Sequence, residues 1–172
     1  MIKKATVVLT AIIIIFLGYN MYSQNKEIKF YEDNAASSFK SLLLILHDTE
    51  YKLNELLEEP NMIKRDELQS VSDRLYGIFS VSHNTTHAIR IAFNEETERY
   101  YNSLDSIFRN LADASANYQV NDGQLSEEDK ERLIEAQKHL KLVNYHFPYQ
   151  NNITAEYLSN GFDGFNKEKE LN

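Results

Sequence analysis

Residues that interrupt helices are scarce in this chain and gather at a few places. Its 172 residues include five glycines and two prolines. Pro60, Gly123 and Pro148 coincide with breaks in the spacing of apolar residues, and Gly161 and Gly164 follow near the end. Because glycine and proline are the strongest local interruptions of regular structure, the long stretches between them favour helices over strands. The sequence therefore predicts an all-α protein.

Apolar residues recur every three or four positions between these breaks, as amphipathic helices require. We expect such helices over residues 24–59, 62–93, 95–118 and 126–147. Four amphipathic helices joined by short links predict an antiparallel four-helix bundle. Within the first helix, Leu42–Leu46 is apolar on every side, so this turn is expected to be buried all round. The full apolar stripe of the first helix comprises Ile28, Tyr31, Ala35, Phe39, Leu42, Leu46 and Leu53.

Several residues suggest where these helices begin, cross or end. Asn94 is a candidate N-cap, and Ser126 is another because three acidic residues follow it at the positive end of the helix dipole. Gly77 lies in the middle of a helix, which indicates a close helix crossing. Residues 154–159 are expected to add one or two turns, and residues 161–172 are expected to form a flexible tail.

The N-terminal segment predicts a membrane anchor. Residues 5–22 carry no charge, and this length is near the lower limit for a helix that crosses a bilayer. Lys3 and Lys4 precede the span, so the positive-inside rule places the N-terminus in the cytoplasm. We expect residues 1–23 to be an uncleaved anchor and residues 24–160 to form the bundle domain outside the cytoplasm.

A cleaved signal peptide is the alternative, and the protein would then be secreted. The aliphatic core Ala5–Leu17 has the length of a signal-peptide core. Cleavage requires small residues at positions −3 and −1, however. Cutting after Ser23 would place Met21 at position −3, so the uncleaved anchor is favoured.

The charge of the predicted exported part excludes some partners. Removing Lys3 and Lys4 from the 18 basic residues leaves 16 against 26 acidic residues, a net charge of −10 for residues 23–172. Nucleic acid is a poor partner for such a domain, because phosphate binding needs clustered Lys and Arg. Anionic lipid headgroups would also repel it. The chain has no cysteine, which excludes disulfides, thiolate zinc sites and cysteine nucleophiles.

The candidates for site chemistry are few. His83 and His87 lie four residues apart, so one helix face could present both imidazoles to a metal. No third ligand is evident nearby, and surface histidines on a polar turn are the simpler interpretation. The acidic runs lie beside predicted helix starts, where the helix dipole favours acids without any catalytic role. We therefore predict no catalytic residues, no metal site and no cofactor.

Aromatic residues are dense after the fourth predicted helix. Tyr145, Phe147, Tyr149 and Tyr157 could form a contact patch, since aromatics are enriched in interfaces. Packing over the end of the bundle is the favoured interpretation of the same residues.

Three functional hypotheses are compatible with these patterns, and the least supported of them is an enzyme of unrecognised type. The first is a non-enzymatic interaction module, anchored in a membrane and bound to another membrane, envelope or surface protein. The second is a sensory bundle that holds a small ligand between its helices and acts through a membrane partner. An exposed apolar patch would favour the first, and a polar-lined pocket inside the bundle would favour the second.

Overall fold

The computed structural model of the protein describes residues 2–58, 63, 65–120 and 125–171. Within these ranges the side chains of residues 2–13, 65, 75, 78–81, 119, 120, 170 and 171 are outside the description. The helices are α1 (Ile2–Glu58), α2 (Arg65–Phe93), α3 (Glu98–Val120), α4 (Glu127–His146) and α5 (Ala155–Leu171). The described residues form helices and no strand, so the predicted all-α class is confirmed. The predicted breaks at Pro60 and Gly123 lie outside the described residues.

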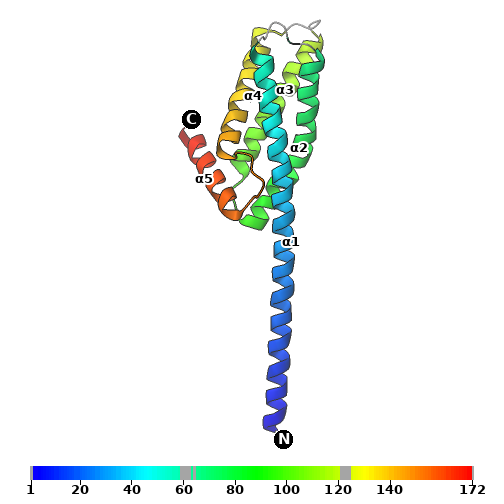
Figure 1. Ribbon diagram of the computed structural model, residues 1–172, viewed down its shortest axis with the longest axis vertical. Coiled ribbons are helices and arrows are strands. Elements are labelled where there is room, and N and C mark those ends of the chain that lie inside the picture. Colours follow the sequence, from blue (N-terminus) through cyan, green and yellow to red (C-terminus); the bar gives the residue numbers. More distant parts are fainter. Residues whose placement is uncertain (1, 59–62, 64, 121–124, 172) are drawn as a thin grey trace.

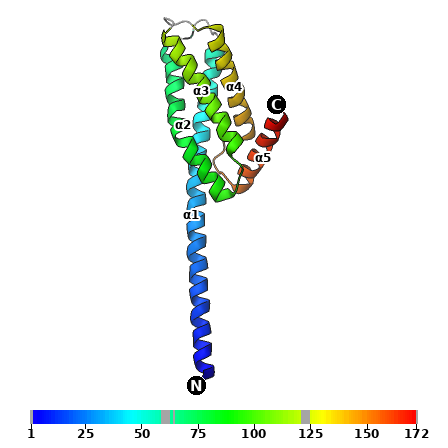
Figure 2. The same cartoon turned by 180° about the vertical axis from the view of Figure 1, so that it is seen from behind.

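The helices α1 to α4 form the bundle, running alternately in opposite directions (Figure 1). Each packs against the next along the chain, and α4 also packs against α1, so the four helices close into a ring. The helix α5 lies outside this ring, against α4 and α3 (Figure 2). Beyond the bundle, α1 continues alone as a long projection, and we call its residues 2–34 the stalk.

The apolar stripe of α1 runs through both the bundle and the stalk, but it is covered in the bundle alone. Ile28 and Tyr31 are 53% and 63% exposed, although they were expected to face a core. The reason is that the other bundle helices end above this level of α1 (Figure 1). The remaining predicted stripe residues are buried as expected: Ala35, Phe39, Leu42, Leu46 and Leu53.

The expectation that Leu42–Leu46 is buried on every side was wrong. Leu44 is 55% exposed, whereas Leu42, Leu43 and Leu46 are buried. In a ring of four helices, each helix keeps one side towards solvent, and Leu44 lies on that side of α1. An apolar residue on the outer side of a bundle helix is common and needs no special explanation.

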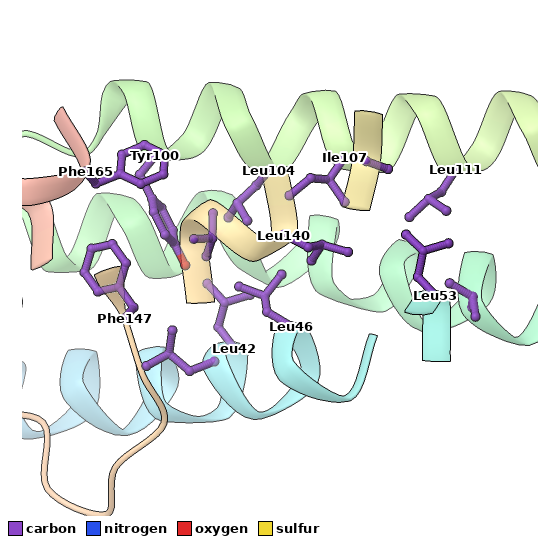
Figure 3. Close-up of a cluster of buried hydrophobic side chains, with 14 of the residues drawn as sticks. Leu42, Leu46, Leu53, Tyr100, Leu104, Ile107, Leu111, Leu140, Phe147 and Phe165 are labelled. Carbon is purple, nitrogen blue, oxygen red and sulfur yellow. The ribbon is translucent and has the colours of Figure 1, made fainter. Parts of the chain in front are cut away.

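The core changes character along the bundle (Figure 3). Its middle consists of aliphatic side chains from facing helices, including Leu46, Leu104, Ile107 and Leu140. Towards the stalk, aromatic rings replace them, and this end is closed by α5. Each α3 and α4 residue predicted to face the core is buried or partly buried.

The start of α4 confirms the predicted cap. The Asp129 amide donates to Ser126 Oγ at 3.1 Å, and the Ser126 amide donates to Asp129 Oδ2 at 3.2 Å, which completes a capping box. Asn117 on α3 also donates to Asp129 Oδ1, at 2.7 Å. Burial opposes ionisation of Asp129, but the hydrogen bonds from Ser126 and Asn117 outweigh it and lower the pKa of Asp129. The cap therefore also ties α3 to α4.

The predicted start of α3 was wrong by three residues. Asn94 has a φ of +55°, the left-handed conformation that commonly follows the end of a helix, so it terminates α2 instead of capping α3. The carbonyl of Thr97 accepts the first helical hydrogen bond of α3, from Tyr101, at 2.9 Å. Buried Thr97 also donates from Oγ1 to the Thr86 carbonyl, which joins the start of α3 to α2.

The end of the chain differs from the expected short turn and tail. The helix α5 continues to Leu171 and buries Phe162 and Phe165, two of its residues beyond 160. Gly161 and Gly164 were interpreted as breaks, but they permit close packing. A Cβ at Gly161 would overlap the Phe147 ring, and one at Gly164 would lie 2.6 Å from His146 Nδ1. Gly77 has the opposite surroundings, because a Cβ there would meet nothing within 4 Å, so the close crossing predicted for it is wrong.

Among the residues whose side chains are described, no helix is both long enough and apolar enough to cross a membrane. The transmembrane helix predicted for residues 5–22 is thus not supported by the structure. The side chains of residues 5–13 lie outside the description.

Candidate functional site

Two residues of the predicted contact patch are used to hold α5 on the bundle. Phe147 is fully buried at the end of α4, and its ring centroid lies 4.8 Å from that of Phe162 and 5.1 Å from that of Tyr100. Tyr157 is half-buried and donates its hydroxyl to the Pro148 carbonyl at 3.0 Å. Burial raises the pKa of Tyr157, so its hydroxyl stays protonated as the donor. These two aromatics pack over the bundle end, as the favoured interpretation held.

The other two aromatics of the predicted patch remain at the surface. Tyr145 is 76% exposed, and Tyr149 is also exposed. The Tyr149 amide donates to His47 Nε2 at 3.1 Å, which fixes the connection after α4 against α1. The four residues do not form one continuous exposed surface, and a partner contact at Tyr145 or Tyr149 stays a prediction.

The aromatic core beneath α5 contains one unsatisfied polar atom. Tyr100 is fully buried among the rings of Phe39, Phe147, Phe162 and Phe165. Its hydroxyl oxygen has no hydrogen-bond partner among the described residues. Burial and the nearby Tyr157 raise the pKa of Tyr100 well above its usual range. The neutral hydroxyl is therefore surrounded by described apolar groups that offer it no hydrogen bond.

His83 and His87 lie together in a surface hollow of about 280 Å³ between α2 and the start of α3. The His83 ring packs edge-on against Tyr101, with centroids 5.4 Å apart, and Arg90 Nη2 lies 3.3 Å from His87 Nδ1. A guanidinium beside His87 disfavours a second cation there. No cluster of three or more potential metal ligands occurs among the described residues.

A second pair of histidines joins α5 to α4. His146 Nε2 lies 2.7 Å from Glu168 Oε2, and His139 Nδ1 lies 3.2 Å from Lys169 Nζ. Burial lowers the pKa of His139, and the charge of Lys169 lowers it further against the opposing effect of Glu135. Burial also lowers the pKa of Lys169. The periodicity of α4 gave no signal for these contacts, because their partners lie in the segment expected to be a tail.

A larger hollow of about 760 Å³ lies between the distal ends of α1 and α4. Leu57 and Ile134 provide apolar surface, while Glu58, Lys130 and Glu131 supply charges of both signs. Asn54 accepts a hydrogen bond of 2.6 Å from Gln137 at the edge of this hollow, which joins the two helices. Mixed charges on an open surface give no preference for one class of ligand.

A further candidate surface is the uncovered apolar face of the stalk. Its exposed apolar side chains include Ile14, Leu17, Met21, Ile28 and Tyr31. Sequence periodicity identified Ile28 and Tyr31 as part of a stripe but assigned them to the core. A repeat pattern shows which residues share a face, but it does not show how far the neighbouring helices extend.

The chain matches no protein-family model, no curated protein and no solved structure.

Proposed function

We propose that this protein is a membrane-anchored interaction module whose helical bundle stands outside the cytoplasm and binds another membrane or envelope protein. One observation carries the proposal: α1 is a single uninterrupted helix from Ile2 to Glu58. The predicted anchor segment and the first helix of the bundle are therefore parts of one continuous helix. We infer that this helix sets the distance between the bundle and the membrane.

Two observations support the proposed membrane anchor: the charge pattern of the sequence and the exposure of its apolar side chains. Residues 5–22 are uncharged and follow Lys3 and Lys4, the arrangement of a signal-anchor with a cytoplasmic N-terminus. Within this span Ile14, Ile15, Phe16 and Leu17 are all exposed around the helix. Apolar side chains on every side of one isolated helix are unfavourable in water and favourable in lipid.

Binding to a protein is favoured over binding to a small ligand by the way the bundle is filled. Its centre holds packed leucine, isoleucine and aromatic side chains (Figure 3), whereas the hollows described above open at the surface. Small-ligand sites usually enclose most of their ligand in a concave, largely apolar pocket. A long uncovered apolar face on the stalk instead suits a protein partner.

The test is capture of a partner from the native membrane. The tagged full-length chain is crosslinked in intact cells, extracted in mild detergent and purified, and an unrelated single-span protein at matched abundance serves as the control. We expect one membrane or envelope protein to accompany the chain reproducibly and to be absent from the control. Recovery of nothing above the control would contradict the proposed function.

A further inference from the structure

One face of α1 carries apolar residues from the stalk into the bundle. Its positions in the stalk are Ile14, Leu17, Met21, Gln24, Ile28 and Tyr31, and it continues into buried Ala35, Phe39, Leu42 and Leu46. Exposure on this face falls from 63% at Tyr31 to 2% at Ala35, one turn later. The same face of one helix is thus covered by neighbouring helices in the bundle, whereas none of the other described helices covers it in the stalk (Figure 1).

The stalk positions have the spacing of a coiled-coil seam. Ile14, Met21 and Ile28 are seven residues apart, and Leu17, Gln24 and Tyr31 form the second series three residues later. Such a repeat is that of the a and d positions, which pack against one neighbouring helix. Five of the six positions are apolar, and Gln24 is the polar member. Ile14, Leu17 and Met21 lie within the proposed membrane span of residues 5–22, so the part of the seam outside the bilayer is Gln24, Ile28 and Tyr31.

The charges beside this seam decide between a second copy and a different partner. With Ile28 at position a, Glu27 occupies position g and Glu32 occupies position e, while Lys26 and Lys29 lie at outer positions. In a parallel pair, each g residue faces the e residue five positions further along the other helix. Two copies would therefore place Glu27 of each against Glu32 of the other.

Two copies in one membrane would have to pair in parallel, a step that rests on the proposed function and its anchor. Both resulting Glu27–Glu32 contacts would be repulsive, and like charges across such an interface destabilise it. A partner helix with Lys or Arg at the facing positions converts both contacts into attractions. Charge therefore favours a different protein over a second copy.

We propose that the stalk face around Ile28 and Tyr31 docks a parallel helix of a different membrane protein, one with apolar a and d positions flanked by Lys or Arg. The acidic flanks of the seam determine the choice of partner, and the apolar positions supply the contact area.

The test uses the full-length chain in vesicles of neutral phosphatidylcholine. Two synthetic single-span peptides share one apolar heptad sequence and differ at the positions that face Glu27 and Glu32, where one has Lys and the other Glu. Association is measured by resonance energy transfer between labels on the chain and the peptide. We expect the Lys peptide to bind roughly tenfold more tightly, a difference of about 1.4 kcal/mol. Added salt should reduce this preference.

Matched variants separate the seam from general apolar adhesion. Ile28→Ser with Tyr31→Ser should abolish binding of both peptides. Phe30→Ser should leave the preference between the peptides unchanged and weaken binding much less than the double variant. Phe30 is 64% exposed at an outer position of the same turn, and it meets the seam through an edge-on ring contact with Tyr31, with centroids 6.0 Å apart. Glu27→Lys with Glu32→Lys should reverse the preference between the peptides. Four of the substituted side chains are exposed, and the fifth, that of Glu32, is partly buried. Because none of them belongs to the core, these variants should fold.

Several results would overturn the inference. These are equal binding of the two peptides, an equal loss with Phe30→Ser, or self-association of the chain that Ile28→Ser with Tyr31→Ser removes. A loss of vesicle attachment alone in the same double variant would assign the face to lipid. If a captured native partner stays bound to the double variant, the seam inference fails while the proposed function stands. If the peptides discriminate but no native partner is captured, the proposed function fails instead.

Discussion

The ammonium group of Lys169 donates a hydrogen bond of 3.2 Å to Nδ1 of His139, which joins the last turns of α5 to α4. Because Nδ1 accepts this bond, the proton of neutral His139 lies on Nε2, which faces Glu135 Oε1 at 3.2 Å. Protonation of Nδ1 would remove the acceptor and place two cations against each other. Lys138 also faces this group and adds to the positive charge. The docking of α5 therefore depends on a neutral His139.

This contact predicts a loss of stability in mild acid. Burial and Lys169 lower the pKa of His139 below its ordinary value of 6.5, so the unfolded chain binds the proton more readily than the folded protein. The stability that neutral His139 contributes to the folded protein is fully present above pH 6.5. It is lost as the pH falls from there through the lowered pKa. Urea unfolding at pH 7.5 and pH 5.5 should show a larger drop for the wild type than for His139→Gln. Equal drops in the two proteins would contradict this role.

Leu46 and Leu44 provide a matched test of the helical phase of α1. Leu46 is buried in the core, so Leu46→Ala should reduce the free energy of unfolding by roughly 2–5 kcal/mol. Leu44→Ala, half a turn away on the outer side, should change it by less than about 0.5 kcal/mol. Urea unfolding midpoints of the two variants measure the difference. Similar losses at both positions would show that the assigned phase is wrong.

Substitution of two glycines by alanine should change the free energy of unfolding in opposite directions. Gly77→Ala meets open space in the middle of α2 and should stabilise the protein by about 1 kcal/mol through helix propensity. Gly161→Ala would press a methyl group against Phe147, which the rings of Phe39, Tyr100 and Phe162 hold in place. Overpacking of this kind costs roughly 1–3 kcal/mol, and hydrogen exchange should report it as faster exchange in α5. Stabilisation by Gly161→Ala would contradict the close packing of α5.

The hydroxyl of Tyr100 should be dispensable. It is buried and has no hydrogen-bond partner in the described part of the chain, and an unsatisfied buried polar group destabilises the folded state. Tyr100→Phe keeps the aromatic packing and should leave the thermal midpoint unchanged or raise it. A loss of more than about 1 kcal/mol would mean that the hydroxyl makes a hydrogen bond in the folded protein.

Structural features that depend on nearby residues of the same helix could be predicted from the sequence. The Ser126 cap depends on Asp129 three residues away, and the buried face of α1 depends on a spacing of three and four residues. Both signals are complete within a few turns of one helix. Neither required knowledge of a neighbouring element.

Features that depend on distant partners could not be predicted. Gly161 was interpreted as a break because glycine weakens helices, whereas its role is to admit the Phe147 ring from α4. Ile28 was included in the apolar stripe of the first helix because its spacing is helical, although its side chain is 53% exposed. Asn94 is a residue type that often caps the N-terminus of a helix, but its backbone terminates α2. The sequence does not distinguish these two roles, whereas the φ angle does.

The central claim is that α1 holds the bundle outside the cytoplasmic membrane, and labelling of a single cysteine tests it most directly. The chain contains no cysteine, so Asn102→Cys, on the exposed surface of α3, creates one unique thiol. Intact cells are treated with a membrane-impermeant maleimide, and their membranes are then washed with alkaline carbonate. We predict that the thiol is labelled without lysis and that the labelled full-length chain stays in the membrane pellet. Labelling only after lysis, release by carbonate, or a mature chain in the medium that begins near Gln24 would contradict the account.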